Sequence, residues 1–156
     1  MINIRQAKEK DIPAILNLLS QVLEVHAVIR PDLFISKTTK YTEDELREIL
    51  ADKYKPVFVA EENCEVLGYC FCILQRKERS NTQRESTTLY IDDLCVDEKH
   101  RGQHIGRQLA DFATAFARET GCYDITLNVW EGNDAAMGFY RRNGFAVRKT
   151  VMEKIL

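Results

Sequence analysis

A short segment with two glycines and several basic residues has the composition of an anion-binding loop. Residues 100–109 read HRGQHIGRQL and follow an apolar, strand-like run. Gly102 and Gly106 leave room for a phosphate to approach the backbone, and Arg101 and Arg107 add cationic donors at either end. A loop that opens a helix also presents unpaired amides and a partial positive charge. The segment therefore predicts either a phosphate site or a glycine-containing turn that only starts a helix.

The spacing within this loop excludes two common phosphate motifs. The loop lacks the Gly-Lys-Ser/Thr ending of a P-loop, and its G-x-x-x-G spacing differs from the G-x-G-x-x-G of dinucleotide-binding folds. His104 stands where a third glycine would be expected. We expect residue 104 to keep φ below zero, so that a histidine costs little there. Its imidazole could then add a donor to phosphate when protonated.

Two adjacent carboxylates, Asp92 and Asp93, lie on the strand that precedes the loop. Successive side chains of a strand point to opposite faces, so the two are not expected to act as a pair unless a bulge intervenes. A carboxylate with a pKa near ~3.9 is a weak base, better suited to anchoring a cation or to a relay through water. The alternative for each is a solvated or hydrogen-bonding carboxylate at a strand end.

The elements that must position these residues follow from apolar periodicity and from capping residues. Asp11 is the expected N-cap of the first helix, Thr42 and Glu45 form a capping box, and Gly121 closes the third helix. We expect helices over residues 11–26, 42–52, 105–121 and 133–144, and strands over residues 2–7, 56–62, 66–75, 88–97, 123–130 and 145–156. This order, βααβββαβαβ, predicts a mixed α/β sheet in a single domain over residues 1–156.

Composition and charge limit the classes of partner. The chain has 22 Lys and Arg against 24 Asp and Glu, a formal net charge of −2, so no basic excess indicates a nucleic acid or a membrane surface. The N-terminus lacks the apolar region of a signal peptide, and the longest apolar run, YCFCIL, is too short to cross a bilayer. We therefore expect a cytoplasmic protein. Its five cysteines lack zinc-ligand spacing, which predicts reduced thiols and no metal.

Two motifs in the right order resemble those of the GCN5-related N-acetyltransferase (GNAT) superfamily. The stretch LCVDEKHRGQHIGRQL is similar to the family loop Arg/Gln-x-x-Gly-x-Gly/Ala, with His104 replacing its first glycine and with matches at Arg101, Ile105 and Gly106. The stretch LNVWEGNDAAMGFYRRNGF matches the family's Asn-x-x-Ala-x-x-x-Tyr-x-x-x-Gly-Phe at Asn133, Ala136, Tyr140, Gly144 and Phe145. With IRQAKEKDIPAILNLL at the start, the resemblance spans nearly the whole chain. It implies a mostly antiparallel GNAT-like sheet with helices on both faces.

The resemblance also implies acetyl-CoA as cosubstrate, without a metal. Arg101 would flank the cradle for the coenzyme pyrophosphate, which is formed by Gly102, Gln103, His104, Ile105, Gly106 and Arg107. The pantetheine arm and thioester would lie along Leu94, Cys95 and Val96, with one of their amides stabilising the oxyanion. Asn133 would cap its helix and contact the coenzyme.

Acetyl transfer requires a neutral amine and a proton for the departing thiolate. An alkyl amine with a pKa near ~10.4 is only about one part in a thousand neutral at pH 7, so its deprotonation must be assisted. By family position, Tyr140 returns the proton to the thiolate, and Asp92 is favoured as the carboxylate that faces the cleft. Asn128 stands where some peptide-acetylating relatives carry a glutamate base. Cys95 leaves a ping-pong route open, although no His/Asp partner for it is evident.

The acceptor site is expected between residues 26–41 and 75–86. Candidate substrate contacts there and on the neighbouring strands are His26, Arg30, Phe34, Asp93 and Asn128. The prediction is an N-acetyltransferase that moves acetyl from acetyl-CoA to a primary amine of a small molecule or peptide, by direct attack in a ternary complex. The alternative is a non-catalytic acyl-CoA-binding sensor or scaffold module. Exposed strand edges would allow a homodimer.

Overall fold

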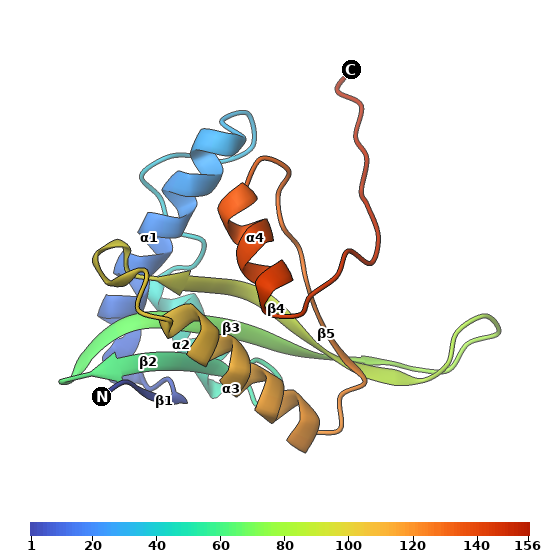
Figure 1. Cartoon of the computed structure of the whole chain (residues 1–156), viewed down its shortest axis with the longest axis horizontal. Helices are drawn as coiled ribbons and strands as arrows, with labels where there is room; N and C mark the ends of the chain where they lie inside the picture. The colour runs from blue at the N-terminus through green and yellow to red at the C-terminus, as the bar shows by residue number, and fades with distance from the viewer.

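A computed structural model describes the whole chain, Met1–Leu156. One five-stranded sheet of order β1-β2-β3-β4-β5 forms its centre (Figure 1). Its strands are β1 (Asn3–Gln6), β2 (Val57–Glu62), β3 (Glu65–Lys77), β4 (Ser86–Val96) and β5 (Asp124–Leu127). The helices are α1 (Ile12–Ile29), α2 (Glu43–Ala51), α3 (Ile105–Glu119) and α4 (Asp134–Arg142). All neighbouring strands are antiparallel except the parallel pair β4 and β5, so the expected mixed, mostly antiparallel sheet is confirmed.

Each face of the sheet has its own apolar core. On one face, Ile15, Leu18 and Leu19 of α1 and Leu46 of α2 are almost fully buried against the sheet. On the other face, the apolar stripe of α3 packs on alternate residues of the strands. Because successive strand residues point to opposite faces, the central strands β2 and β3 are apolar on both sides. The helices therefore cover both faces, as expected.

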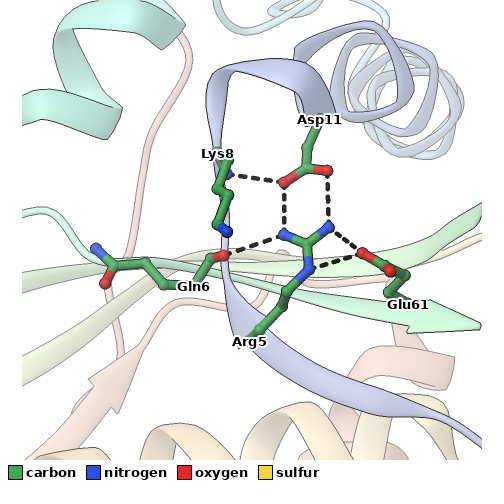
Figure 2. A network of polar contacts seen from close by, with 5 residues as sticks. All are labelled: Arg5, Gln6, Lys8, Asp11 and Glu61. Carbon is green, nitrogen blue, oxygen red and sulfur yellow. Dashed lines mark hydrogen bonds and ion pairs between the residues drawn. The ribbon is translucent and has the colours of Figure 1, made fainter. Parts of the chain in front are cut away.

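A buried polar network holds β1, the start of α1 and β2 together (Figure 2). The Asp11 carboxylate accepts hydrogen bonds from Arg5 Nη1 at 2.7 Å and Nη2 at 2.9 Å, and from the Lys8 backbone N–H at 2.8 Å. Arg5 also pairs with Glu61. Asp11 therefore fixes the turn before α1 and does not make the predicted side-chain bond to the first turn of that helix. The expected capping box of Thr42 and Glu45 is confirmed.

The polar partners of Asp11 change its acidity. Burial pushes the pKa of Asp11 upward, but the hydrogen bonds from Arg5 and the Lys8 backbone outweigh it, so the pKa is lowered. Hydrogen bonding to Asp11 likewise raises the pKa of Arg5. Both groups therefore stay charged at neutral pH and form an ion pair with each other.

The predicted last strand is not formed. Residues 145–156 make no strand pairing, and the order of elements ends at α4. Figure 1 shows this C-terminal segment leaving the body after α4. Its sequence has strand propensity, but a strand also needs a neighbour to complete its backbone hydrogen bonds. The order within one chain is therefore βααβββαβα, without the final strand.

Helix α1, with the turn before it, is the most apolar long segment of the chain. The stretch Glu9–Ile29 has a mean hydropathy of 1.6 and is long enough to cross a membrane by length and composition. The expectation that no segment has that length overlooked this helix, because polar residues interrupt its apolar runs. Ile12, Ile15 and Leu19 are at most 3% exposed and pack in the core of the domain. Here the helix serves as a core helix.

Candidate functional site

The sheet opens between β4 and β5. The two strands pair from Thr88 with Asp124 to Ile91 with Leu127, and β5 ends there while β4 continues to Val96. The last five residues of β4 therefore have no neighbour on that side. The two strands therefore diverge at the end of β4 that leads into the loop.

Backbone groups of β4 are free in this opening. The Asp97 N–H donates to the Leu67 carbonyl of β3 at 2.8 Å. Since the groups of an antiparallel strand alternate, Leu94 and Val96 turn their N–H and C=O groups away from β3 and toward the opening. The side chain of Cys95 points the other way, into the core under α1. The three predicted residues thus offer two backbone positions to a ligand, but not the thiol.

The glycine-containing loop lies at the end of β4 and leads directly into α3. Arg101, Gly102, Gln103 and His104 are all exposed. No backbone N–H from residue 101 to residue 107 donates to any acceptor within the chain. These free amides cluster at the N-terminus of a fifteen-residue helix, where the helix dipole adds a partial positive charge. The loop has the geometry of an anion cradle.

The conformation of His104 corrects the expectation for that position. Its φ is 59° and its ψ is 15°, which is the left-handed region. The loop needs this turn to direct its amides outward at the start of α3, and a family glycine would adopt it without strain. Gly102 also has a positive φ, of 80°. Histidine at 104 therefore carries strain, and its side chain makes no cap for α3.

Gly106 is favoured by tight packing rather than by its backbone conformation. A Cβ at this position would lie 3.2 Å from the Phe139 ring of α4 and 3.6 Å from the Val96 side chain. The glycine lets the start of α3 approach both α4 and β4. The second glycine of the motif therefore brings together the loop, the open end of β4 and the helix that carries Tyr140.

A bulge puts both predicted carboxylates on the same face. The pairing of β3 and β4 shifts between Phe71 and Cys72, so that Asp93 lies opposite Phe71 and Asp92 has no partner. Asp93 accepts a hydrogen bond from Tyr69 at 2.8 Å, and Asp92 accepts one from Tyr41 at 2.5 Å. The expectation of opposite faces fails because the bulge inserts one residue into β4.

The two carboxylates differ in environment. Asp92 pairs with Lys40 at 2.9 Å and lines a small pocket of about 90 Å³ on the α2 side of the sheet. Asp93 has no cation in direct contact and is half-buried. Burial raises the pKa of Asp93 to about 6, against the lowering effect of the Tyr69 hydrogen bond and of the Lys40 charge. Asp93 is thus the carboxylate whose protonation changes nearest neutral pH.

Tyr140 lies on α4 on the other side of the opening. Its ring packs between Phe139 and Phe145 at 5.1 and 5.5 Å, and its hydroxyl makes no hydrogen bond within the chain. Burial, the Cys70 thiol and the charge of Asp93 raise the pKa of Tyr140. The Tyr140 phenol is therefore held protonated within range of the Asp93 charge.

Asn133 caps α4 by accepting the Ala136 N–H at 3.2 Å, as predicted.

Three predicted acceptor contacts meet at the C-terminal end of α1. The His26 ring lies 5.3 Å from the Phe34 ring, which meets the Trp130 ring edge-on at 5.5 Å. Arg30 lies 5.7 Å from the Trp130 ring centre. Burial, with a smaller effect of Lys40, lowers the pKa of His26, so the imidazole is neutral at pH 7. Trp130 was not predicted, because only the fold brings the β5–α4 loop against α1.

Asn128 is separate from this aromatic cluster. It follows β5, is exposed, and donates from Nδ2 to the Tyr90 hydroxyl at 3.2 Å.

A larger groove, of about 610 Å³, runs between α1 and the loop. Its charged lining is formed by Glu24, Lys37, Glu98 and Arg101. Arg101 thus faces α1, while its Nε lies 3.4 Å from the Val96 carbonyl.

The arrangement of β4, the loop and α4 agrees with a comparison to known families. The model of the acetyltransferase (GNAT) family matches residues 22–145. This chain belongs to the GNAT family. The match begins within α1 and ends at Phe145, so it includes the opening, the amide loop and Tyr140.

Individual members of the GNAT family show different degrees of similarity. Streptothricin acetyltransferase of Streptomyces lavendulae is 47% identical over 58 residues, which are 37% of this chain and 31% of that protein. The chain therefore spans less than a third of that relative. Thialysine N-epsilon-acetyltransferase of Bos taurus is 27% identical over 92% of this chain and 83% of its own length.

A solved GNAT-fold structure matches nearly the whole chain. The tetramutant of the BH1408 protein from Bacillus halodurans, determined by X-ray crystallography, is 29% identical and has a TM-score of 0.94. The match covers 99% of this chain and 99% of that chain. The C-terminal segment after α4 therefore falls within the matched region.

Proposed function

We propose that this GNAT protein transfers an acetyl group from acetyl-CoA to a primary amine of a small molecule or peptide, by direct attack in a ternary complex. The observation that carries the proposal is the opening between β4 and β5, which leads to a loop whose seven amides, from residue 101 to residue 107, are free. The strand would align an extended arm, and the helix N-terminus would hold its diphosphate. Membership of the GNAT family supports acetyl-CoA as the ligand.

The residues around the opening suit the binding of a coenzyme with a charged and an extended part. The amides of Gly102 to Arg107 would bind the pyrophosphate, and Arg107 would add charge at the helix start. The N–H groups of Leu94 and Val96 would hydrogen-bond the pantetheine arm and polarise the thioester carbonyl. Such fixed donors stabilise the oxyanion because they need no reorganisation as its charge develops.

Asp93 is better suited than Asp92 to accept the amine proton. The Asp92 carboxylate is engaged by Lys40 and Tyr41, whereas a pKa of about 6 leaves Asp93 ionised at pH 7 and more basic than a solvated carboxylate. We therefore assign the general base to Asp93, directly or through one water, and retain Asp92 as an anchor for Lys40. Activity should fall as the pH drops through about 6, because protonated Asp93 cannot accept a proton.

The departing thiolate would take its proton from Tyr140. The raised pKa keeps this phenol protonated, and its hydroxyl is free to donate. A covalent route through Cys95 is disfavoured. Burial, followed by the charge of Asp93, raises the pKa of Cys95 to about 12, and its sulfur lies 3.6 Å from the Leu18 carbonyl. A neutral thiol in the core is a poor nucleophile.

The acceptor side favours an amine on an extended or partly apolar molecule. Asp92 and Asp93 attract a cation, and the aromatic cluster of His26, Phe34 and Trp130 offers apolar faces. A relative named for N-epsilon acetylation of thialysine supports the amine class.

Thiol release from acetyl-CoA tests the proposed reaction. Small diamines, lysine peptides, amino-acid amines and aminoglycosides would be compared under saturating coenzyme. We expect saturable release with at least one primary amine, and initial-rate patterns that intersect, as a ternary complex requires. Coenzyme binding by calorimetry without release on any of these amines would support a non-catalytic acyl-CoA-binding module instead.

A further inference from the structure

One lysine of the chain lies against the two carboxylates that would attract an acceptor amine. Lys40 belongs to the loop of residues 30–42 that joins α1 to α2. Its Nζ lies 2.9 Å from the Asp92 carboxylate and donates to the Asp92 backbone carbonyl at 3.4 Å. The Lys40 ammonium therefore rests directly on β4, the strand that carries both acidic residues of the site.

The charge of Lys40 also acts on Asp93 and on the acceptor side of the site. Burial raises the pKa of Asp93 to about 6, and the charge of Lys40 opposes this rise although the two groups make no ion pair. Burial, and then the charge of Lys40, lowers the pKa of His26. Charges interact this way only over short distances. The ammonium thus lies within range of both the proposed base and the aromatic cluster.

Tyr41 fixes the part of the loop that carries this lysine. The Tyr41 hydroxyl donates to Asp92 at 2.5 Å, and its ring lies 5.6 Å from the Phe71 ring at the border of the core. The Lys40 Nζ lies 5.5 Å from the centre of the Tyr41 ring. The backbone next to Lys40 is therefore anchored, whereas the Lys40 side chain is 40% exposed and can rotate about the bonds of its flexible stem.

The thioester would lie within reach of the Lys40 side chain. In the proposed complex the Leu94 N–H polarises the acetyl carbonyl, and Leu94 follows Asp92 by two residues on β4. Two residues of a strand span about 7 Å. A lysine side chain covers such a distance by rotating its four-carbon stem. A shift of the ammonium along β4, from Asp92 past Asp93, therefore brings Nζ to the acetyl group.

We propose that Lys40 is a site of self-acetylation, at which the protein transfers an acetyl group from acetyl-CoA to the Lys40 Nζ of the same chain. The inference rests on the proposed function, because it uses the same coenzyme site. The Lys40 nitrogen forms a bond to the acetyl carbon, and the carbon–sulfur bond breaks. Two protons leave the nitrogen: one reaches the departing sulfur by way of Tyr140, and the other passes through Asp93 to solvent. The products are N-acetyl-lysine at position 40 and free coenzyme A.

Mass spectrometry of the protein's own lysines tests the proposal. The whole chain would be incubated at pH 8 with acetyl-CoA that carries a trideuterated acetyl group, without any added amine. The matched control is Lys37, a lysine of the same loop that borders the groove beside α1. We expect label on Lys40 to accumulate at least about tenfold faster than on Lys37, because only Lys40 is held beside the base.

The dependence on protein concentration shows whether the transfer occurs within one chain. The rate constant for labelling of Lys40 should stay the same over a tenfold range of protein concentration, because the reaction is intramolecular. Equal labelling of Lys37 and Lys40, or a rate constant that rises with protein concentration, would overturn the proposal.

Two variants separate transfer at the site from spontaneous acetylation. Asp93→Asn and Tyr140→Phe should each slow the labelling of Lys40 at least about tenfold, because each removes a proton-transfer group, and neither should change the labelling of Lys37. If both variants label Lys40 as fast as the wild type does, the reaction does not use the site and the proposal is wrong.

Thiol release with the panel of amines, measured on the same preparation, keeps the two proposals apart. Wild-type protein that acetylates an added amine but leaves Lys40 unlabelled contradicts self-acetylation alone. Wild-type protein that acetylates neither Lys40 nor any added amine contradicts the proposed function as well.

Discussion

At the residue scale, a bulge in β4 decides which carboxylate can act as the base. Adjacent strand residues normally face opposite sides, and from the sequence alone Asp92 was favoured. The unpaired position of Asp92 turns both side chains to one face, where Lys40 and Tyr41 engage Asp92 and leave Asp93 without a cation. A bulge depends on the register between two strands, so the sequence of β4 alone could not predict it.

Replacing Asp93 by asparagine should separate activity from stability. We expect Asp93→Asn to lower kcat/KM at pH 8 by about 10²–10³-fold, since a positioned base contributes about that factor. The acidic limb of the wild-type pH profile, centred near pH 6, should disappear. Steady-state kinetics from pH 5 to 9 measure both, with Asp92→Asn as the matched control that keeps the acidic limb.

The same Asp93→Asn variant should be more stable at alkaline pH. A raised carboxyl pKa means that the folded state prefers the protonated form, so its stabilising contribution is complete below about pH 4 and is lost as the pH rises through about 6. Asparagine does not ionise. We expect the free energy of unfolding at pH 8 to rise by about 1–2 kcal/mol, measured by urea denaturation. A variant that is less stable at pH 8 than wild type would contradict the buried-charge account.

Tyr140→Phe tests the proton donor. The ring should still pack between Phe139 and Phe145, so calorimetric affinity for coenzyme A should change less than about threefold. In contrast, kcat should fall about 10²-fold because the thiolate loses its acid. Thiol release measures the rate. An unchanged kcat under conditions where chemistry limits turnover would exclude Tyr140 as the acid.

At the element scale, local signals predicted the helix ends well. The capping box at Thr42, the cap at Asn133 and the positive φ of Gly121 and Gly144 follow from short-range chemistry that the sequence displays. The loop before α3 was harder to predict. Its amides were expected to point outward, but the left-handed turn at residue 104 depends on how β4 and α3 meet. A histidine at this position does not indicate such a turn.

Glycine at position 104 should relieve this strain. Both His104→Gly and His104→Ala remove the imidazole. A comparison of the two variants therefore isolates the effect of the backbone preference at residue 104. We expect the glycine variant to be more stable than the alanine variant by about 1 kcal/mol in urea unfolding. Coenzyme affinity of His104→Gly should stay within about tenfold of wild type, because the amides keep their direction. Complete loss of binding would show that the imidazole is itself a ligand.

At the scale of the whole molecule, the sequence predicted the strands of the sheet but not the long-range contacts that join the elements. Alternation and helical periodicity predicted the elements from β1 to α4, but the strand predicted over residues 145–156 is not formed. Whether a segment with strand propensity forms a strand depends on a free sheet edge that lies far away in the sequence. The ion pair of Arg5 with Glu61, 56 residues apart, likewise follows only from the pairing of β1 and β2.

The Arg5 network should make a large contribution to global stability. Asp11→Asn keeps the shape but leaves the Arg5 guanidinium without its bidentate partner, so we expect a loss of about 2–4 kcal/mol at pH 7. Because the pKa of Asp11 is lowered, the wild-type advantage should persist to acidic pH and disappear only as the pH falls below about 4. Denaturation at pH 7 and pH 3 checks both. The matched surface variant Asp44→Asn, at a side chain 90% exposed, should cost less than about 0.5 kcal/mol.

The central claim is that the opening between β4 and β5, with its amide loop, binds the coenzyme. A titration of ¹⁵N-labelled protein with coenzyme A, followed by amide chemical shifts, tests it most directly. We predict the largest shifts at residues 102–107 and at Leu94 and Val96, while pantetheine, which lacks the diphosphate, moves only the β4 amides. Binding that shifts other amides and leaves residues 102–107 unchanged would contradict the claim.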